Sequence, residues 1–345
     1  MSAAILRRAA EESFFRPRQR FAHLAHDHVP FDRLIGKTSY EGRALRECVD
    51  REGVVGIVGP RGGGKSSLIA HVCKELPDSH LALRVPVSGA DDPTSVSIVC
   101  AVTLSQALND IDMAKRERRR LARLRGDSKG SERSLGAGGT LGGGPIPAAV
   151  HADLGTLREQ VQTNALAVDR LAGIDRLISI LVARELRPVF VLEDTEAAIG
   201  GEDAATADGF IDGPIRAFVH EVDAACLIAI QDVFRPLEAF EHLSQSMALV
   251  EIPNLQSTAA RSALEAIVEN RLSQFDLDKA SAADVLSKEA IDRLVGFYVE
   301  TSGNLRATLA ALQSSAEYAA EQGGELIGDG QMRAGVEDWH AQSSR

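Results

Sequence analysis

Apolar and polar residues alternate in two different ways along this chain, and the pattern changes near residue 253. Before that point, short apolar runs are separated by longer amphipathic stretches. The runs cover residues 54–58, 81–87, 188–192, 224–230 and 248–252. Runs of this length predict buried strands, and their alternation with helices predicts a parallel sheet covered on both faces. We therefore expect an α/β fold with a five-stranded parallel sheet.

The stretches between these runs predict the helices that cover the sheet. Residues 38–52 and 65–76 carry apolar positions at helical spacing, and two longer helices are expected over residues 94–125 and 154–185. Residues 126–147 separate the two long helices and include eight glycines. This composition predicts a loop or ribbon inserted between helices.

Only helices are predicted after residue 253. They cover residues 258–275, 287–301, 305–322 and 330–340. The change of pattern divides the chain into an α/β domain at 38–253, with an insertion at about 115–150, and a C-terminal helical lid domain at 254–345. Residues 1–37 hold four of the eleven phenylalanines, so we expect an N-terminal arm that packs onto the main body.

Composition excludes several classes of protein. Apolar residues make up 44% of the chain and charged residues 25%, which is typical of a globular protein rather than a disordered or fibrous one. No apolar run approaches the roughly 20 residues that a membrane helix requires. The N-terminus lacks the apolar core of a signal peptide, and the four cysteines form no C-x-x-C pair. We expect a cytoplasmic protein without a membrane partner.

The charge is unevenly distributed. The net charge is −11, but the segment from Lys115 to Arg133 has nine basic and three acidic residues, a local charge of +6, which leaves −17 on the rest. One interpretation of such a segment on an acidic body is a specific contact with the phosphate backbone of DNA or RNA. A solvated helix end, stabilised by the helix dipole, and a docking site for an acidic protein are the alternatives.

The clearest motif is a glycine-rich loop at residues 59–66, which matches G-x-x-x-x-G-K-[ST] in full. It follows a predicted strand and begins a predicted helix. Its glycines let backbone N–H groups surround phosphate oxygens, and the helix N-terminus adds positive charge. We expect Lys65 to reach the β- and γ-phosphates and Ser66 to bind Mg²⁺. The expected nucleotide-binding residues are Gly59, Pro60, Arg61, Gly62, Gly63, Gly64, Lys65, Ser66 and Ser67.

Two acids follow the strand at 188–192. Glu193 and Asp194 lie at its C-terminal end, where ligands bind in open α/β sheets. We expect Glu193 to act on the metal through water and Asp194 to orient or deprotonate the attacking water. Both acids, with Ser66, form the expected metal site. Glu196 is a nearby third acid.

The phosphate loop, the acidic strand end about 130 residues later and the helical C-terminal region together resemble the AAA+ ATPases. Within them, the chain is most similar to the origin-recognition and helicase-loader group. The resemblance implies ATP and Mg²⁺ as cofactors, a helical lid over the nucleotide and self-assembly or a protein partner. Glu193 departs from the aspartate that is usual at its position.

The same resemblance assigns three further residue roles. Gln231, at the end of the 224–230 strand, corresponds to the sensor-1 residue. The run from Ser302 to Arg306 resembles the start of the sensor-2 helix, which implies that Arg306 contacts the γ-phosphate. The arginine finger of the family has no clear counterpart, and Arg235 and Arg216 are the candidates.

These features predict an ATPase that binds ATP and hydrolyses it slowly. Turnover would drive assembly or engagement of DNA, or of a partner in DNA processing or antiviral defence. The alternative is an oligomerising signalling switch of the STAND type with little turnover. The replacement of the usual aspartate by Glu193 and the lack of a clear arginine finger favour this alternative. A nucleic-acid adaptor with a purely structural nucleotide is the third hypothesis. A steady-state ATPase assay with and without DNA separates them.

Overall fold

The structure is a computed structural model of the chain. It describes residues 2–17, 21–35, 39–86, 100, 103–104, 106–108, 110–112, 167–193, 195, 204–253, 255, 257–277 and 279–343. The basic segment at 115–133, the glycine-rich stretch at 126–147, Asp194 and Glu196 lie outside these residues, as does most of the helix expected over 94–125.

The sheet has five parallel strands in the order β2-β3-β4-β1-β5. The strands are β1 (Val54–Gly59), β2 (His80–Pro86), β3 (Arg187–Glu193), β4 (Ala225–Gln231) and β5 (Ala248–Glu251). β3 and β4 are buried along nearly their whole length, as strands covered on both faces must be. The predicted α/β fold class with a five-stranded parallel sheet is confirmed.

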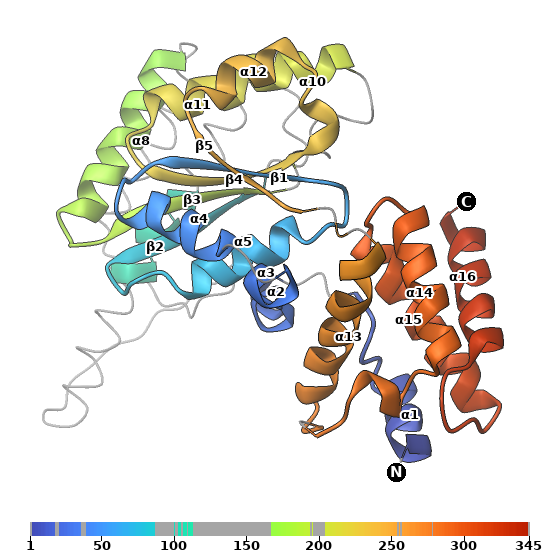
Figure 1. Cartoon of the computed structure of the whole chain (residues 1–345). Helices are drawn as coiled ribbons and strands as arrows, with labels where there is room; N and C mark the ends of the chain where they lie inside the picture. The colour runs from blue at the N-terminus through green and yellow to red at the C-terminus, as the bar shows by residue number, and fades with distance from the viewer. Residues whose placement is uncertain are drawn as a thin grey trace, which may run out of the picture.

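Helices cover both faces of the sheet (Figure 1). On one face, α4 (Tyr40–Val49) and α5 (Lys65–Lys74) share a core with alternate residues of the strands. The other face is covered by α8 (Ala167–Val182), α10 (Ala204–Phe210), a π-helical turn (Ile211–Ile215), α11 (Arg216–Glu221) and α12 (Glu238–Ser244). A 3-10 turn, Asp232–Phe234, follows β4. The helix expected over 154–185 is described from Ala167 onward.

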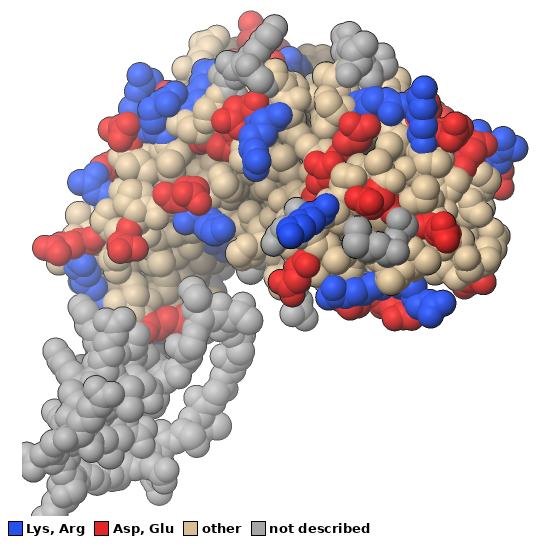
Figure 2. All heavy atoms as spheres, turned by 60° about the horizontal axis from the view of Figure 1, so that its bottom comes forward, with Lys and Arg blue, Asp and Glu red and all other residues tan. Residues whose placement is uncertain are grey.

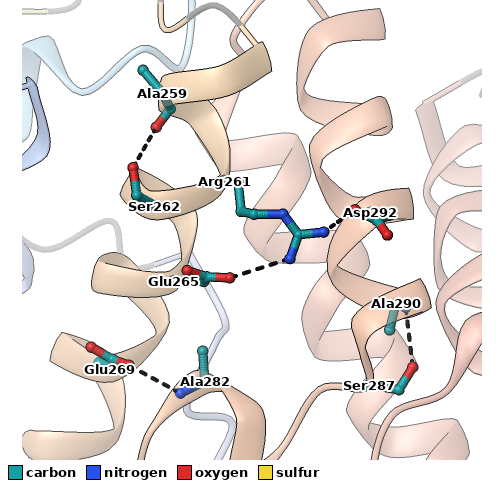
Figure 3. Close-up of polar contacts among 9 residues, drawn as sticks. All are labelled: Ala259, Arg261, Ser262, Glu265, Glu269, Ala282, Ser287, Ala290 and Asp292. Atoms are coloured by element: carbon teal, nitrogen blue, oxygen red, sulfur yellow. Dashed lines mark hydrogen bonds and ion pairs between the residues drawn. The ribbon is translucent and has the colours of Figure 1, made fainter.

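After β5 the chain forms a C-terminal helical bundle. Its members are α13 (Ser257–Ser273), a 3-10 turn (Ala282–Asp284), α14 (Lys288–Glu300), α15 (Leu305–Glu321) and α16 (Asp329–Ser343). Arg261 of α13 makes ion pairs with Glu265, at 3.5 Å, and with Asp292 of α14 (Figure 3). Glu269 accepts a hydrogen bond of 3.3 Å from the backbone N–H of Ala282. The Arg261–Glu265 pair lies within α13, whereas the contacts with Asp292 and Ala282 join α13 to the elements that follow it.

The N-terminal segment contains α1 (Ser2–Glu11), α2 (Phe21–Asp27) and α3 (Phe31–Ile35). α1 lies within the C-terminal helical bundle, where Phe14 and Phe15 are fully buried (Figure 1). The ring of Phe14 stacks on Phe275 with centroids 3.8 Å apart, and Phe15 N–H donates to Gln313 Oε1 at 3.0 Å.

α2, in contrast, packs against α5 beneath the sheet. The N-terminal segment therefore packs on the α/β domain through α2 and on the helical bundle through α1. α1 has its apolar face covered by α15, because the bundle offers it a complementary apolar surface. Among the described residues, no helix is both long and apolar enough to cross a membrane.

Candidate nucleotide site

The glycine-rich loop connects β1 to α5 and depends on two of its glycines. Gly62 has a φ of 73° and Gly64 a φ of 101°, values that side chains with a Cβ rarely adopt. Gly64 is the N-cap residue of α5, and Gly63 N–H donates to the Pro60 carbonyl at 3.1 Å. The loop therefore curves over the N-terminus of α5, where backbone N–H groups have no partner within the helix.

Lys65 is held inside this loop. Its side chain is largely buried, and Nζ donates to the carbonyls of Gly59 at 2.9 Å and Pro60 at 2.8 Å. A buried ammonium group needs such acceptors because its desolvation is costly. Phosphate oxygens can replace these carbonyls, so Lys65 is already placed for a phosphate ligand.

A pocket lies between the glycine-rich loop, the N-terminal segment and the C-terminal helical bundle. The loop contributes all residues from Arg61 to Ser67, and the bundle contributes Arg306. Apolar walls come from the N-terminal segment and from α13, α14 and α15: Pro17, Val29, Phe31, Leu264, Ile267, Tyr298 and Leu309. A phosphate cradle beside apolar walls is the arrangement that a nucleotide requires.

Not every predicted binding residue contacts this pocket in the same way. Gly59 and Pro60 are not among the described residues that line it, and they act through the carbonyls that hold Lys65. Ser66 lines the pocket. Ser67 also lines it, but its hydroxyl donates to the Leu24 carbonyl at 3.1 Å and so joins α5 to α2.

Glu193 ends β3 at the C-terminal edge of the sheet and is almost fully buried. Its carboxylate accepts from Arg84, with Oε2 at 3.0 Å from Nε and 2.9 Å from Nη2. The Arg84 guanidinium also lies over the ring of Phe21, 4.4 Å from its centroid. No sequence motif pointed to Arg84. The metal role of Glu193 stays a prediction. In that role, Glu193 would hold metal-bound water while it remains paired with Arg84.

The other residues at this edge come from β4 and the chain after β3. Gln231 ends β4 and is in register with Gly59, which places it beside the first residue of the glycine-rich loop. Thr195 is buried and donates to the Ala229 carbonyl at 2.7 Å. Neither Glu193 nor Gln231 is among the described residues that line the pocket. The catalytic role of Asp194, outside the described residues, stays a prediction.

Arg306 is brought to the glycine-rich loop by the start of α15. Leu305 N–H donates to the Gly62 carbonyl at 3.1 Å, and the Asn304 side chain caps α15 by accepting from Ala307 N–H at 3.0 Å. A Cβ built on Gly62 would lie 2.1 Å from Asn304 Oδ1. The loop and the helix that carries Arg306 are therefore in direct contact.

We expect Gly62→Ala to separate this helix from the loop. The added methyl group would overlap Asn304, and alanine at a positive φ costs about 1–2 kcal/mol. ATP affinity should fall at least about tenfold, which corresponds to about 1.4 kcal/mol. Isothermal titration measures it. Gly296→Ala in α14 is the control, since nothing lies within 4 Å of its Cβ position. Equal affinities for both variants would contradict the expectation.

The two arginine-finger candidates are each paired within the chain. Arg216 Nη1 lies 2.7 Å from Asp212 Oδ1, and Arg235 Nη2 lies 2.8 Å from Glu251 Oε2. Both side chains are partly exposed. Their role as a finger stays a prediction.

Sequence reasoning missed two polar pairs that join the N-terminal segment to α13 and to α4. Asp27 and Arg271 form a buried ion pair of 2.7 Å between α2 and α13, and both line the pocket. His28 Nε2 lies 2.8 Å from Glu41 Oε1, which also accepts from Phe31 N–H at 2.9 Å. Burial alone would raise the pKa of the Glu41 carboxyl, but these hydrogen bonds lower it below its ordinary value. No motif marks these residues, since each is an ordinary type at an irregular spacing.

Comparison with known proteins identifies the fold. No protein-family model matches the sequence, and no curated protein is similar to it. Two similar solved structures are from Aeropyrum pernix, each with a TM-score of 0.51 and each covering 90% of this chain. They are the ORC1 protein in complex with DNA, at 14% identity, and the ORC2 protein in ADPNP–ADP complexes, at 15%. The chain spans 66% and 69% of their lengths, respectively.

Proposed function

We propose that this chain, whose fold is that of the AAA+ ATPases of the origin-recognition group, binds ATP with Mg²⁺ and hydrolyses it slowly. The observation that carries the proposal is the pocket in which the glycine-rich loop and Arg306 meet. The nucleotide state would control assembly or engagement of DNA or of a DNA-processing partner. The ADPNP and ADP of the A. pernix ORC2 structure support nucleotide binding by this fold.

Each side chain has a distinct task in this proposal. Lys65 and the N–H groups of the glycine-rich loop bind the β- and γ-phosphates, and Arg306 binds the γ-phosphate from the helical bundle. Ser66, which lines the pocket, and the carboxylate of Glu193 suit Mg²⁺, a cation that prefers oxygen ligands and retains water. Bound Mg²⁺ neutralises phosphate charge. Gln231 orients the γ-phosphate or the attacking water, and Asp194 takes the proton of that water.

Asp194→Asn should retain ATP binding and lose hydrolysis. An amide can hold the attacking water but cannot take its proton, and general bases typically contribute about 10²–10⁴-fold to rate. Steady-state phosphate release and ATP affinity are measured together. Glu196→Gln is the matched control. Turnover at the level of the unmodified protein would exclude Asp194 as the base, whereas equal loss in both variants would indicate a general effect of the local charge.

A signalling switch with little turnover is the second candidate. Two observations favour it: Glu193 is ion-paired with Arg84, and both finger candidates have partners within the chain. The switch predicts ATP-dependent oligomers with phosphate release near background. Light scattering with and without ATP, on the same sample as the turnover assay, distinguishes the two candidates.

We propose that DNA, if it is a partner, is bound by the segment from Lys115 to Arg133. The A. pernix ORC1 structure contains DNA. On the face shown in Figure 2, basic and acidic side chains of the described residues are interspersed, without a broad basic area. The concentration of positive charge in this segment is the supporting observation.

Reversing Arg118, Arg119 and Arg120 to Glu should weaken DNA binding and leave ATP binding intact. Each neutralised phosphate contributes to the salt dependence, so the slope of log K against log salt should also become shallower by up to about 0.9 per lost contact. Fluorescence anisotropy at several salt concentrations measures both.

The matched control reverses three exposed arginines elsewhere and carries the same change in net charge. These are Arg51, Arg187 and Arg333. Equal weakening by both triple variants would show that overall charge, rather than this segment, determines the affinity.

A further inference from the structure

His28 lies in the wall of the nucleotide pocket, between α2 and α3. Its side chain is only 4% exposed, and Nε2 lies 2.8 Å from Glu41 Oε1. Phe31 N–H donates to the same carboxylate oxygen and holds it in place. A buried histidine is therefore fixed, through one of its two ring nitrogens, at the edge of the pocket.

The Glu41 contact determines which nitrogen carries the proton. The pKa of Glu41 is held below its ordinary value, so its side chain is a carboxylate, which can only accept hydrogen bonds. Nε2 of His28 must then be protonated. In the neutral ring Nδ1 is an acceptor, and it has no hydrogen-bond partner among the described residues.

Two further aromatic rings lie close to His28. Phe31 packs edge-on at 5.7 Å, and the His71 ring of α5 lies 4.9 Å away, both between ring centroids. Burial lowers the pKa of His71. Glu41 from α4 supplies the negative charge on the side of Nε2.

We infer that Nδ1 of His28 recognises the base of the bound nucleotide by accepting a hydrogen bond from an exocyclic amine. This makes His28 a specificity-determining residue for 6-amino purines, and it rests on the proposed nucleotide site. A 6-oxo purine would place a carbonyl oxygen against the Nδ1 acceptor and leave both without a hydrogen. A site built to hydrogen-bond one group discriminates strongly against an analogue that lacks it, because its own buried polar atom is then unpaired.

The test compares ATP with ITP, which carries an oxygen in place of the 6-amino group. Dissociation constants are measured by titration calorimetry at about pH 8, where an ordinary imidazole is neutral. The unmodified protein should bind ATP at least about tenfold more tightly than ITP. His28→Gln should bring the two constants within about twofold of each other, since an amide can rotate to donate or accept.

His71→Gln is the matched control. It changes a histidine that contacts His28 but is not among the described residues that line the pocket, so the preference for ATP should persist. Glu41→Gln is the second variant, because its amide can also donate to Nε2 and release the ring from one tautomer. Glu41→Gln should weaken the preference for ATP over ITP. If thermal unfolding shows that His28→Gln is unstable, the Glu41→Gln result tests the inference in its place.

Three results would overturn the assignment. The first is equal binding of ATP and ITP by the unmodified protein, and the second is an unchanged preference for ATP in both the His28 and Glu41 variants. The third is a loss of that preference in His71→Gln as large as in His28→Gln. These results are distinct from a failure of the proposed function. If neither triphosphate binds, the nucleotide site itself is wrong. If both bind and binding depends on Lys65 but not on His28, only this inference fails.

Discussion

Replacing Lys65 with alanine should remove most nucleotide binding while the protein still folds. Nζ is held by the Gly59 and Pro60 carbonyls inside the loop, which places the positive charge where phosphate oxygens would lie. Hydrogen bonds to charged groups contribute about 1.5–3 kcal/mol each. The loss of one or two such bonds corresponds to an ATP affinity reduced about 10- to 10,000-fold. Phosphate release should fall with it.

Lys74→Ala is the control for this variant, because Lys74 belongs to the last turn of the same helix α5. ATP affinity is measured by calorimetry, and thermal unfolding without nucleotide shows whether each variant folds. Unchanged ATP affinity in a folded Lys65→Ala protein would refute the glycine-rich loop as a phosphate site. An equal effect of Lys74→Ala would point to damage to α5 rather than to loss of a ligand.

The largest effect on stability is expected for Phe14→Ala. The Phe14 side chain is fully buried, and its ring stacks on Phe275 within the C-terminal helical bundle. Replacing a buried phenylalanine with alanine typically costs about 3–5 kcal/mol, because apolar contacts are lost and a cavity is left. The bundle should unfold at a lower denaturant concentration, and ATP affinity should fall because the bundle carries Arg306.

Glu11→Ala tests the same helix at an exposed position and should change the free energy of unfolding by less than about 0.5 kcal/mol. Guanidinium titration followed by circular dichroism measures both variants. A change below about 1 kcal/mol for Phe14→Ala, well short of a core substitution, would show that α1 is not a structural part of the bundle.

The glycine-rich loop and the strands could be predicted because their signals are local. A contiguous motif between an apolar run and a helical stretch identifies a phosphate loop without knowledge of its neighbours, since backbone N–H groups make the site. The five apolar runs likewise predicted strands that the structure confirms within two residues at each end. Arg306 was predicted through resemblance, because its short motif is also contiguous, and the structure places it in the lining of the pocket.

Contacts between distant segments could not be predicted in this way. The Arg84–Glu193 pair depends on β2 and β3 being neighbours, which the order of elements along the chain does not reveal. The apolar residues of the N-terminal arm indicated burial, but not that Phe14 would pack on Phe275 rather than on the sheet.

By itself, then, the sequence determined the kind of each element and predicted a phosphate loop around Lys65, because hydrophobic periodicity and loop geometry act over a few residues. Only the tertiary structure decided which side chains share a site. His28 lines the candidate pocket and is hydrogen-bonded to Glu41 because α2, α4 and α5 pack together beneath the sheet. Packing of this kind is selected by the combined shape and apolar area of several elements, and no single stretch of sequence contains that information.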